Sequence, residues 1–124
     1  MKALILAAGY AVRLYPLTEN QPKPLLRVGG KEIINYILSN LESVNEIKDV
    51  YVVTNDRFYP LFQQWKSNYV GSKNLLLIND GTKSNEDRLG AIGDMLLVLQ
   101  QQQIKEDLLV IAGDNLFRFS LKDF

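Results

Sequence analysis

The sequence predicts an α/β fold, a Rossmann-like three-layer sandwich in which a mostly parallel sheet lies between helices. Four short runs are rich in Val, Ile and Leu, as strands buried on both faces are, and apolar residues recur at helical spacing between these runs. Such alternation requires crossover connections, which are right-handed in parallel sheets. The expected strand order is 3-2-1-4, so strand order reverses between the first and fourth strands, where ligands of open α/β sheets bind.

The four expected strands are short and are separated by three expected helices. The strands cover residues 2–7, 49–54, 74–78 and 108–112. The helices cover residues 32–44, 56–68 and 84–102.

Each expected helix has its own sequence signal. In the second helix, Pro60 is compatible only with the first turn, where the missing N–H has no partner to lose. Ser84 and Asp87 have the spacing of a capping box at the start of the third helix. All three helices carry an apolar stripe that we assign to core packing. In the third helix this stripe is Leu89, Ile92, Leu96 and Leu99.

Length and charge restrict the class of protein. The chain has 124 residues, 47% of them apolar, which is enough for one core and one domain over residues 1–124. Fourteen basic and fourteen acidic residues balance, which argues against nucleic acid or an anionic membrane as the main partner. The sequence shows no apolar run long enough for a membrane span and starts directly with the first strand. We therefore expect a cytoplasmic protein.

The absence of two residue types restricts the chemistry. The sequence contains no cysteine and no histidine, which excludes disulfides, thiolate sites and histidine-based catalysis or metal binding. Catalysis would have to use carboxylates, lysine, arginine, hydroxyls, backbone amides and a metal bound by oxygen atoms. These are the groups used for phosphoryl and nucleotidyl transfer.

The segment after the first strand is typical of a phosphate-binding loop. Ala8 and Gly9 end the strand with small residues, which let a ligand approach backbone N–H groups. Arg13 can bind phosphate oxygens in pairs, and Lys23 supplies a compact positive charge between two prolines that restrict its position. The alternative is a surface loop with solvated cations, but the anchoring of all these residues to one strand end favours an anion site.

A second chemical group follows the fourth strand. Asp114 comes directly after the apolar run and Gly113, so it lies at the same switch point as the Gly9 loop. A carboxylate there suits Mg²⁺, which prefers a few protein oxygens together with substrate phosphates. The alternative is an aspartate that only completes a turn.

The quoted segments resemble the sugar-1-phosphate nucleotidyltransferases, the nucleotide-sugar pyrophosphorylases. The family pattern is close to LAAGxGTRLxPLT followed by xPKPLLxVxGKPII, and this chain has LAAGYAVRLYPLT followed by QPKPLLRVGGKEII. A weaker likeness reaches IAGDNLF, so the resemblance covers nearly the whole chain. It implies Mg²⁺-dependent transfer of a nucleoside monophosphate from an NTP to a sugar 1-phosphate or a similar phosphomonoester, with release of pyrophosphate.

The resemblance also assigns roles to residues. Arg13 and Lys23 would be catalytic, and Asp114 would bind the metal. The nucleotide would be bound by Ala8, Gly9, Arg13, Asn79, Asp80 and Gly90. For the last three, a turn and close helix–sheet packing are equally compatible explanations.

This chain departs from the family pattern at three positions. Ala11 replaces a glycine, which would cost about 1–2 kcal/mol if φ there is positive. Val12 replaces a Thr or Ser and so removes a hydroxyl that could donate to phosphate. Glu32 replaces a proline near a helix start, which the helix tolerates.

The end of the sequence predicts an incomplete domain. Ser120 and Asp123 have the spacing of another capping box, and the sequence stops at Phe124. We therefore expect an N-terminal nucleotide-binding portion of a truncated nucleotidyltransferase domain, without the acceptor-binding half. It would form a homo-oligomer or associate with the missing C-terminal portion.

Two other classes remain as alternatives. A non-catalytic nucleotide-sensing module would keep the fold and lack the acceptor half. A flavodoxin-like or dinucleotide-binding domain would also have a glycine turn after the first strand. That second class is disfavoured because the chain has no GxGxxG motif and no acidic residue closes the second strand.

Overall fold

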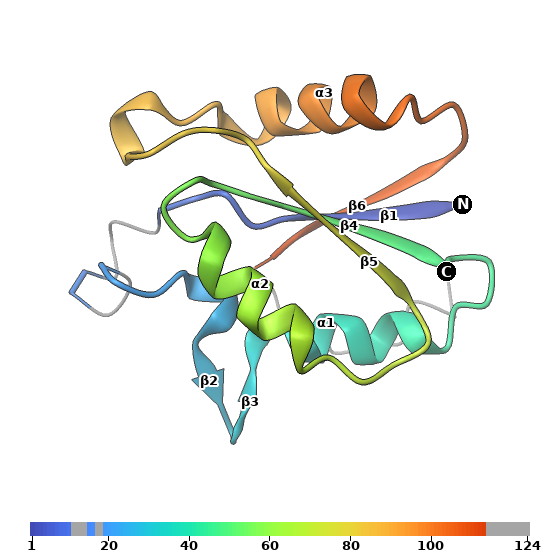
Figure 1. Cartoon of the computed structure of the whole chain (residues 1–124). Coiled ribbons are helices and arrows are strands. Elements are labelled where there is room, and N and C mark those ends of the chain that lie inside the picture. The colour runs from blue at the N-terminus through green and yellow to red at the C-terminus, as the bar shows by residue number, and fades with distance from the viewer. Residues whose placement is uncertain (11–14, 17–18, 114–124) are drawn as a thin grey trace.

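The computed structural model describes residues 1–10, 15–16 and 19–113. These residues form a parallel four-stranded sheet in the order β5-β4-β1-β6 (Figure 1). The strands are β1 (Lys2–Leu6), β4 (Asp49–Thr54), β5 (Asn74–Asn79) and β6 (Leu108–Ala112). Numbered along the chain, this is the predicted order 3-2-1-4, and the predicted strands are confirmed to within one residue at their ends.

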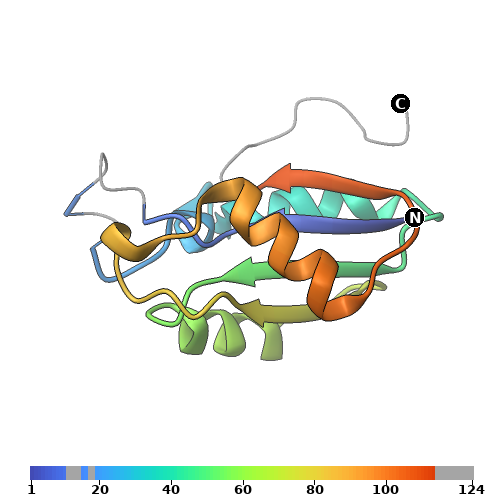
Figure 2. The same ribbon diagram turned by 90° about the horizontal axis from the view of Figure 1, so that it is seen from above.

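Helices cover both faces of the sheet. In Figure 1, α1 (Ile33–Glu42) and α2 (Tyr59–Ser67) lie on one face and α3 (Gly90–Gln102) lies on the other. Figure 2 shows the same α3 crossing the sheet, seen from above. Side chains of β4 alternate between the two faces, so Val50 and Val52 join the core under α1 and α2, and Tyr51 and Val53 join the core under α3. The three-layer architecture is confirmed.

Three short elements were absent from the sequence prediction. A 3₁₀ turn, η2 (Lys23–Leu25), leads into an antiparallel hairpin of β2 (Arg27–Val28) and β3 (Lys31–Glu32). Gly29 and Gly30 make its tip with φ of 62° and 81°, values that glycine adopts without strain. The hairpin escapes sequence analysis because two-residue strands have no periodicity to detect.

The second and third helices differ in how well they were predicted. Pro60 lies in the first turn of α2, as expected. The third helix begins at Gly90 rather than at Ser84, because Gly90 has φ of 77° and breaks helical geometry. The Ser84–Asp87 capping box does form, but it closes a separate 3₁₀ turn, η3 (Asn85–Asp87).

The predicted apolar stripe of the third helix is wrong. Leu89, Ile92 and Leu96 are 46%, 73% and 52% exposed, whereas Asp94 and Val98 are buried. Helix α3 carries apolar residues on most of its circumference, so the pattern alone does not show which side meets the sheet. None of the described helices is long and apolar enough to cross a lipid bilayer.

Candidate functional site

A cavity of about 340 Å³ lies at the carboxyl ends of β1 and β6, the predicted switch point. We call it the switch-point cavity. Its walls come from β1 and the following loop, from η2, from the start of α3 and from the end of β6. The lining residues are Leu6, Ala7, Ala8, Gly9, Lys23, Pro24, Arg88, Gly90, Ala91, Asp94 and Ala112.

The structure brings together four of the residues that were predicted to bind nucleotide or act in catalysis. Ala8, Gly9, Lys23 and Gly90 all line the switch-point cavity, although 81 positions separate Gly9 from Gly90 in the numbering. Arg13 and Asp114 lie outside the described residues, and their assigned roles stay predictions. Ala11, Val12 and the predicted capping box at Ser120 also lie outside the described residues. The effect of Ala11 and Val12 on the loop therefore stays a prediction as well.

Asn79 and Asp80 do not line the cavity but lie close behind it. The Asn79 side chain donates to Asp56 at 3.0 Å and accepts from the Gly81 backbone at 2.8 Å. Asp80 Oδ1 accepts hydrogen bonds from the backbone N–H and the hydroxyl of Thr82, at 2.9 and 2.7 Å. Both side chains therefore shape the loop after β5.

The Lys23 backbone is held rigidly. Pro22 and Pro24 on either side are buried, and the Leu26 N–H donates to the Lys23 carbonyl at 3.0 Å to close the turn. Proline fixes φ and leaves the turn few alternative conformations. Lys23 therefore enters the cavity wall from a pre-formed turn, which lowers the conformational entropy lost when an anion binds.

Two buried residues hold the loop after β1. Asn55 follows β4 and is fully buried, and its amide donates to the Ala8 carbonyl at 3.0 Å while its oxygen accepts from the Phe58 N–H at 2.9 Å. The Tyr10 hydroxyl donates to the Thr82 carbonyl at 3.2 Å, and burial raises the pKa of Tyr10. Sequence analysis missed both residues, although a polar side chain directly after a buried strand was a detectable signal for Asn55.

Glycine is required at one side of the cavity and leaves room at the other. A Cβ atom at Gly90 would meet no atom within 4 Å, but its φ of 77° would strain any other residue. A Cβ at Gly9 would also meet no atom of the described residues within 4 Å, which leaves room there for a ligand to approach the backbone. At Gly113 a Cβ would lie 2.7 Å from the Leu6 carbonyl oxygen, so glycine is needed where β6 packs against β1.

The cavity wall contains an unusual acid. Asp94 is 5% exposed, and neither its Oδ1 nor Asp80 Oδ2 receives a hydrogen bond from any donor that the structure describes. Burial and a hydrogen bond with the Asp80 carboxyl raise the pKa of Asp94 to about 8. Asp94 therefore retains its proton at neutral pH, and one shared proton gives both carboxyls a partner. Sequence analysis did not single out Asp94, because an aspartate in a helix is usually solvated.

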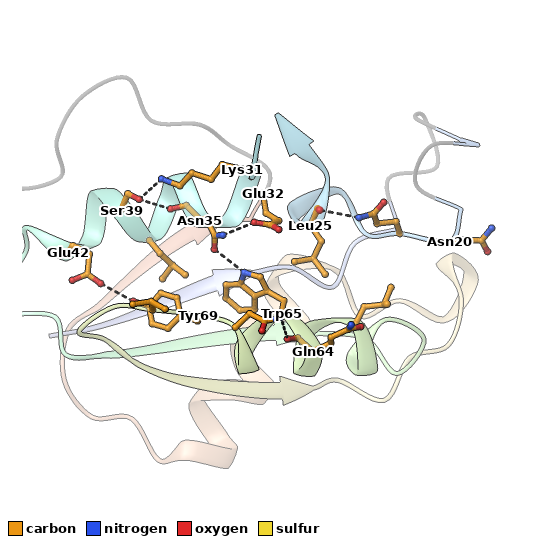
Figure 3. Close-up of a pocket in the computed structure, with 15 residues that line it drawn as sticks. Asn20, Leu25, Lys31, Glu32, Asn35, Ser39, Glu42, Gln64, Trp65 and Tyr69 are labelled. Carbon is orange, nitrogen blue, oxygen red and sulfur yellow. Dashed lines mark hydrogen bonds between the residues drawn. The ribbon is translucent and has the colours of Figure 1, made fainter. Parts of the chain in front are cut away.

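A larger cavity of about 730 Å³ lies between α1 and α2, and we call it the helix-pair cavity (Figure 3). Its polar side chains are bonded to one another. Trp65 Nε1 donates to Asn35 Oδ1 at 2.9 Å, and Asn35 donates in turn to Glu32 at 2.7 Å. The Tyr69 hydroxyl donates to Glu42 at 2.9 Å, and burial together with this carboxylate raises the pKa of Tyr69 to about 12.

The described residues contain no group of three or more His, Cys, Asp or Glu side chains that could hold a metal ion. Asp114, the predicted metal ligand, follows directly after Gly113, the last residue described before the end of the chain. The Gly113 N–H donates to the Leu6 carbonyl at 2.8 Å, so the residue that follows β6 is hydrogen-bonded to the end of β1.

Comparison with known proteins adds independent evidence. The sequence matches the nucleotidyl transferase family over residues 2–124. It is 32% identical over 126 residues to the bifunctional protein GlmU of Methanococcus vannielii, covering 100% of this chain and 27% of that protein. It is 31% identical over 123 residues to the UTP–glucose-1-phosphate uridylyltransferase AglF of Haloferax volcanii, covering 99% of this chain and 47% of that protein.

A solved structure agrees with these relatives. The CTP:phosphocholine cytidylyltransferase of Streptococcus pneumoniae superimposes with a TM-score of 0.73 at 29% identity, over 97% of this chain and 47% of that one. This chain thus spans less than half the length of each of these proteins. Because the family match extends over residues 2–124, the chain belongs to the nucleotidyl transferase family.

Proposed function

We propose that this chain is the nucleotide-binding portion of an enzyme that transfers a nucleoside monophosphate from an NTP to a phosphorylated acceptor, by preference a sugar 1-phosphate. The observation that carries the proposal is the meeting of Gly9, Lys23 and Gly90 around the switch-point cavity. An open backbone and a rigidly mounted cation in one cavity suit a polyphosphate. Relatives named for GlmU, uridylyltransferase and cytidylyltransferase activities support the same reaction class.

In this reaction an acceptor phosphate oxygen forms a bond to the α-phosphorus of the NTP. The bond from that phosphorus to the oxygen bridging to the β-phosphate breaks, and pyrophosphate leaves with the electron pair. The protein has little covalent work to do, so it positions the anions and stabilises their charge. Lys23 would contact the α-phosphate or the acceptor phosphate, and the Gly9 loop with Arg13 would bind the triphosphate.

Magnesium belongs to the proposal as well. Bound Mg²⁺ would neutralise phosphate charge and polarise the reacting phosphorus. Mg²⁺ needs only one or two carboxylates besides phosphate oxygens, and Asp114 is the residue that would hold it. The acceptor would be bound mainly by parts that the relatives have beyond the matched region, supplied by a continuation of this chain, a partner chain or a second copy. We propose that the reaction takes place in the cytoplasm, where NTPs are abundant.

The test compares Lys23→Ala with Lys66→Ala, since Lys66 is an exposed lysine on α2 that does not line the switch-point cavity. Pyrophosphate release is measured with each of the four common NTPs, Mg²⁺ and a sugar 1-phosphate or phosphocholine. We expect Lys23→Ala to lose at least about tenfold in rate, equivalent to 1.4 kcal/mol, while Lys66→Ala keeps full activity.

A smaller loss at Lys23 would remove this residue from catalysis. Tight, Lys23-dependent NTP binding without any pyrophosphate release, even when the acceptor half is supplied, would favour the nucleotide-sensing module instead. A ligand at 100 times its Kd should add about 2.7 kcal/mol to the free energy of unfolding, so thermal shift detects binding independently of turnover.

A further inference from the structure

The strongest unassigned feature of the molecule is the buried acid in the wall of the switch-point cavity. Asp94 is only 5% exposed to solvent, yet it belongs to the residues that line the cavity. A buried polar atom without a donor is costly unless something satisfies it. Asp94 Oδ1 and Asp80 Oδ2 are two such atoms, and the shared proton between these carboxyls accounts for them.

The shared proton fixes what the pair can offer a ligand. Asp80 is held by two hydrogen bonds from Thr82, so it stays behind the cavity wall as the fixed partner of Asp94. With the proton engaged between the two carboxyls, the lone pairs that remain on Asp94 can only accept hydrogen bonds. Asp94 therefore presents an acceptor to a ligand in the cavity. Its other charged neighbours around the cavity are Lys23 and Arg88.

The cavity lining indicates which part of a nucleotide would meet this acceptor. Lys23 and Arg88 are the cations of the lining and would attract phosphates. The rest of the lining is mostly small and apolar, which suits the flat faces of a base and would leave the hydroxyls of a sugar unpaired. The apolar members are Leu6, Ala7, Ala8, Pro24, Ala91 and Ala112.

This inference rests on the proposed function: we infer that Asp94 selects the base of the NTP. Asp94 accepts a hydrogen bond from an exocyclic amino group on the hydrogen-bonding edge of the base. Asp80 is the positioning residue that holds Asp94 in place. The site then favours NTPs whose base carries such an amino group over those with only a carbonyl at the matching position. A carbonyl oxygen would face the Asp94 oxygen, two acceptors without a proton between them, and this penalises the keto base.

The test uses nucleotide pairs in which an amino group is replaced by a carbonyl. CTP and UTP differ in this way at one ring position, with a proton added to the neighbouring ring nitrogen of UTP, and ATP and ITP differ in the same way. Titration calorimetry gives Kd for each on the wild type, on Asp94→Ala and on Asp94→Asn. We expect the wild type to prefer the amino member of at least one pair by about tenfold or more.

The variants separate base reading from structural support. Asp94→Ala should abolish the preference, so that the amino and keto members of each pair bind with equal Kd. Asp94→Asn should keep the preference, because its amide can donate to Asp80 while its oxygen still accepts from the base. Glu86→Gln is the matched control, since Glu86 is an exposed acid in the same segment and lies outside the cavity lining. It should change no Kd.

Several outcomes would overturn the inference. Equal binding of amino and keto members in all pairs would do so, as would a preference that survives in Asp94→Ala. A loss of 2′-hydroxyl preference in Asp94→Ala, seen by comparing CTP with dCTP, would assign Asp94 to the ribose instead. Equal weakening of all nucleotides in both Asp94 variants would make the residue structural only. Failure of every NTP to bind would contradict the proposed function itself, which is a distinct result.

Discussion

The switch-point cavity at the carboxyl ends of β1 and β6 and the helix-pair cavity between α1 and α2 differ in how their polar groups are satisfied. The helix-pair cavity is the larger, about 730 Å³ against about 340 Å³, and its walls include Trp65 and Tyr69. Several of its polar side chains nevertheless form hydrogen bonds with one another (Figure 3). In the switch-point cavity, the buried carboxyl of Asp94 has the carboxyl of Asp80 as its partner among the described residues, and the lone pairs that remain on Asp94 have no donor there. Size therefore says less about function here than unmet hydrogen-bonding capacity.

The largest expected effect comes from the residue that holds the switch-point loop. Asn55→Ala removes a donor from the Ala8 carbonyl and an acceptor from the Phe58 N–H, in a fully buried position. We expect the free energy of unfolding to fall by about 2–4 kcal/mol, because unsatisfied buried backbone groups cost about 1–3 kcal/mol each. Urea denaturation measures the loss. Asn68→Ala, at an exposed asparagine on the helix-pair side, is the control and should change stability by less than about 0.5 kcal/mol.

A second effect is a dependence of stability on pH that originates in the switch-point cavity. The unfolded chain releases the Asp94 proton near pH 4, while the folded protein keeps it up to about pH 8. Raising the pH through this interval therefore favours unfolding, by at most about 1.4 kcal/mol per pH unit. Full stability from this group is present below pH 4 and is lost as the pH rises through the pKa of folded Asp94.

Denaturation midpoints between pH 5 and pH 8 test this dependence. Carboxyls with lowered pKa values, such as Glu42 and Asp49, affect stability only at more acidic pH and leave this window clear. Asp94→Asn cannot ionise and should flatten the decline. A wild-type protein whose stability is constant from pH 5 to pH 8 would contradict the shared proton.

The smallest effect belongs to the helix-pair cavity. Trp65→Phe deletes the N–H that donates to Asn35 and keeps most of the ring packing. We expect a loss of about 1 kcal/mol in stability and no change in NTP affinity. Reduced NTP affinity in this variant, measured by the calorimetry used for the Asp94 variants, would show that the two cavities are coupled and would end the contrast between them.

Much of the fold could be predicted because strongly periodic segments encode it locally. The four strands and their order follow from alternating patterns, and the rule that ligands bind at a switch point indicated the Gly9 loop. Gly90 was assigned to the same site by the family resemblance. The β2–β3 hairpin is too short to leave a pattern. The inward face of α3 depends on the sheet beneath it, since apolar residues occur all around that helix.

The contact of Asp80 with Asp94 was beyond sequence reasoning for a different reason. An aspartate in a helix is usually solvated, and only the tertiary structure shows that this one is buried against a second carboxyl. Sequence analysis could have identified Asn55 as a structurally important residue, because a polar residue directly after a buried strand needs a hydrogen-bond partner. Its partner, the Ala8 carbonyl, is 47 positions away and could not be named in advance.

Asn55 also links the two sides of the molecule mechanically. Its amide donates a hydrogen bond to the carbonyl of Ala8 in the wall of the switch-point cavity. It also accepts one from the N–H of Phe58 at the beginning of α2, the helix that carries Trp65. A nucleotide that shifts the loop after β1 must therefore either lengthen the hydrogen bonds of Asn55 or displace the first turn of α2. Hydrogen exchange at the Phe58 amide would therefore report occupancy of the switch-point cavity from a residue that does not line it.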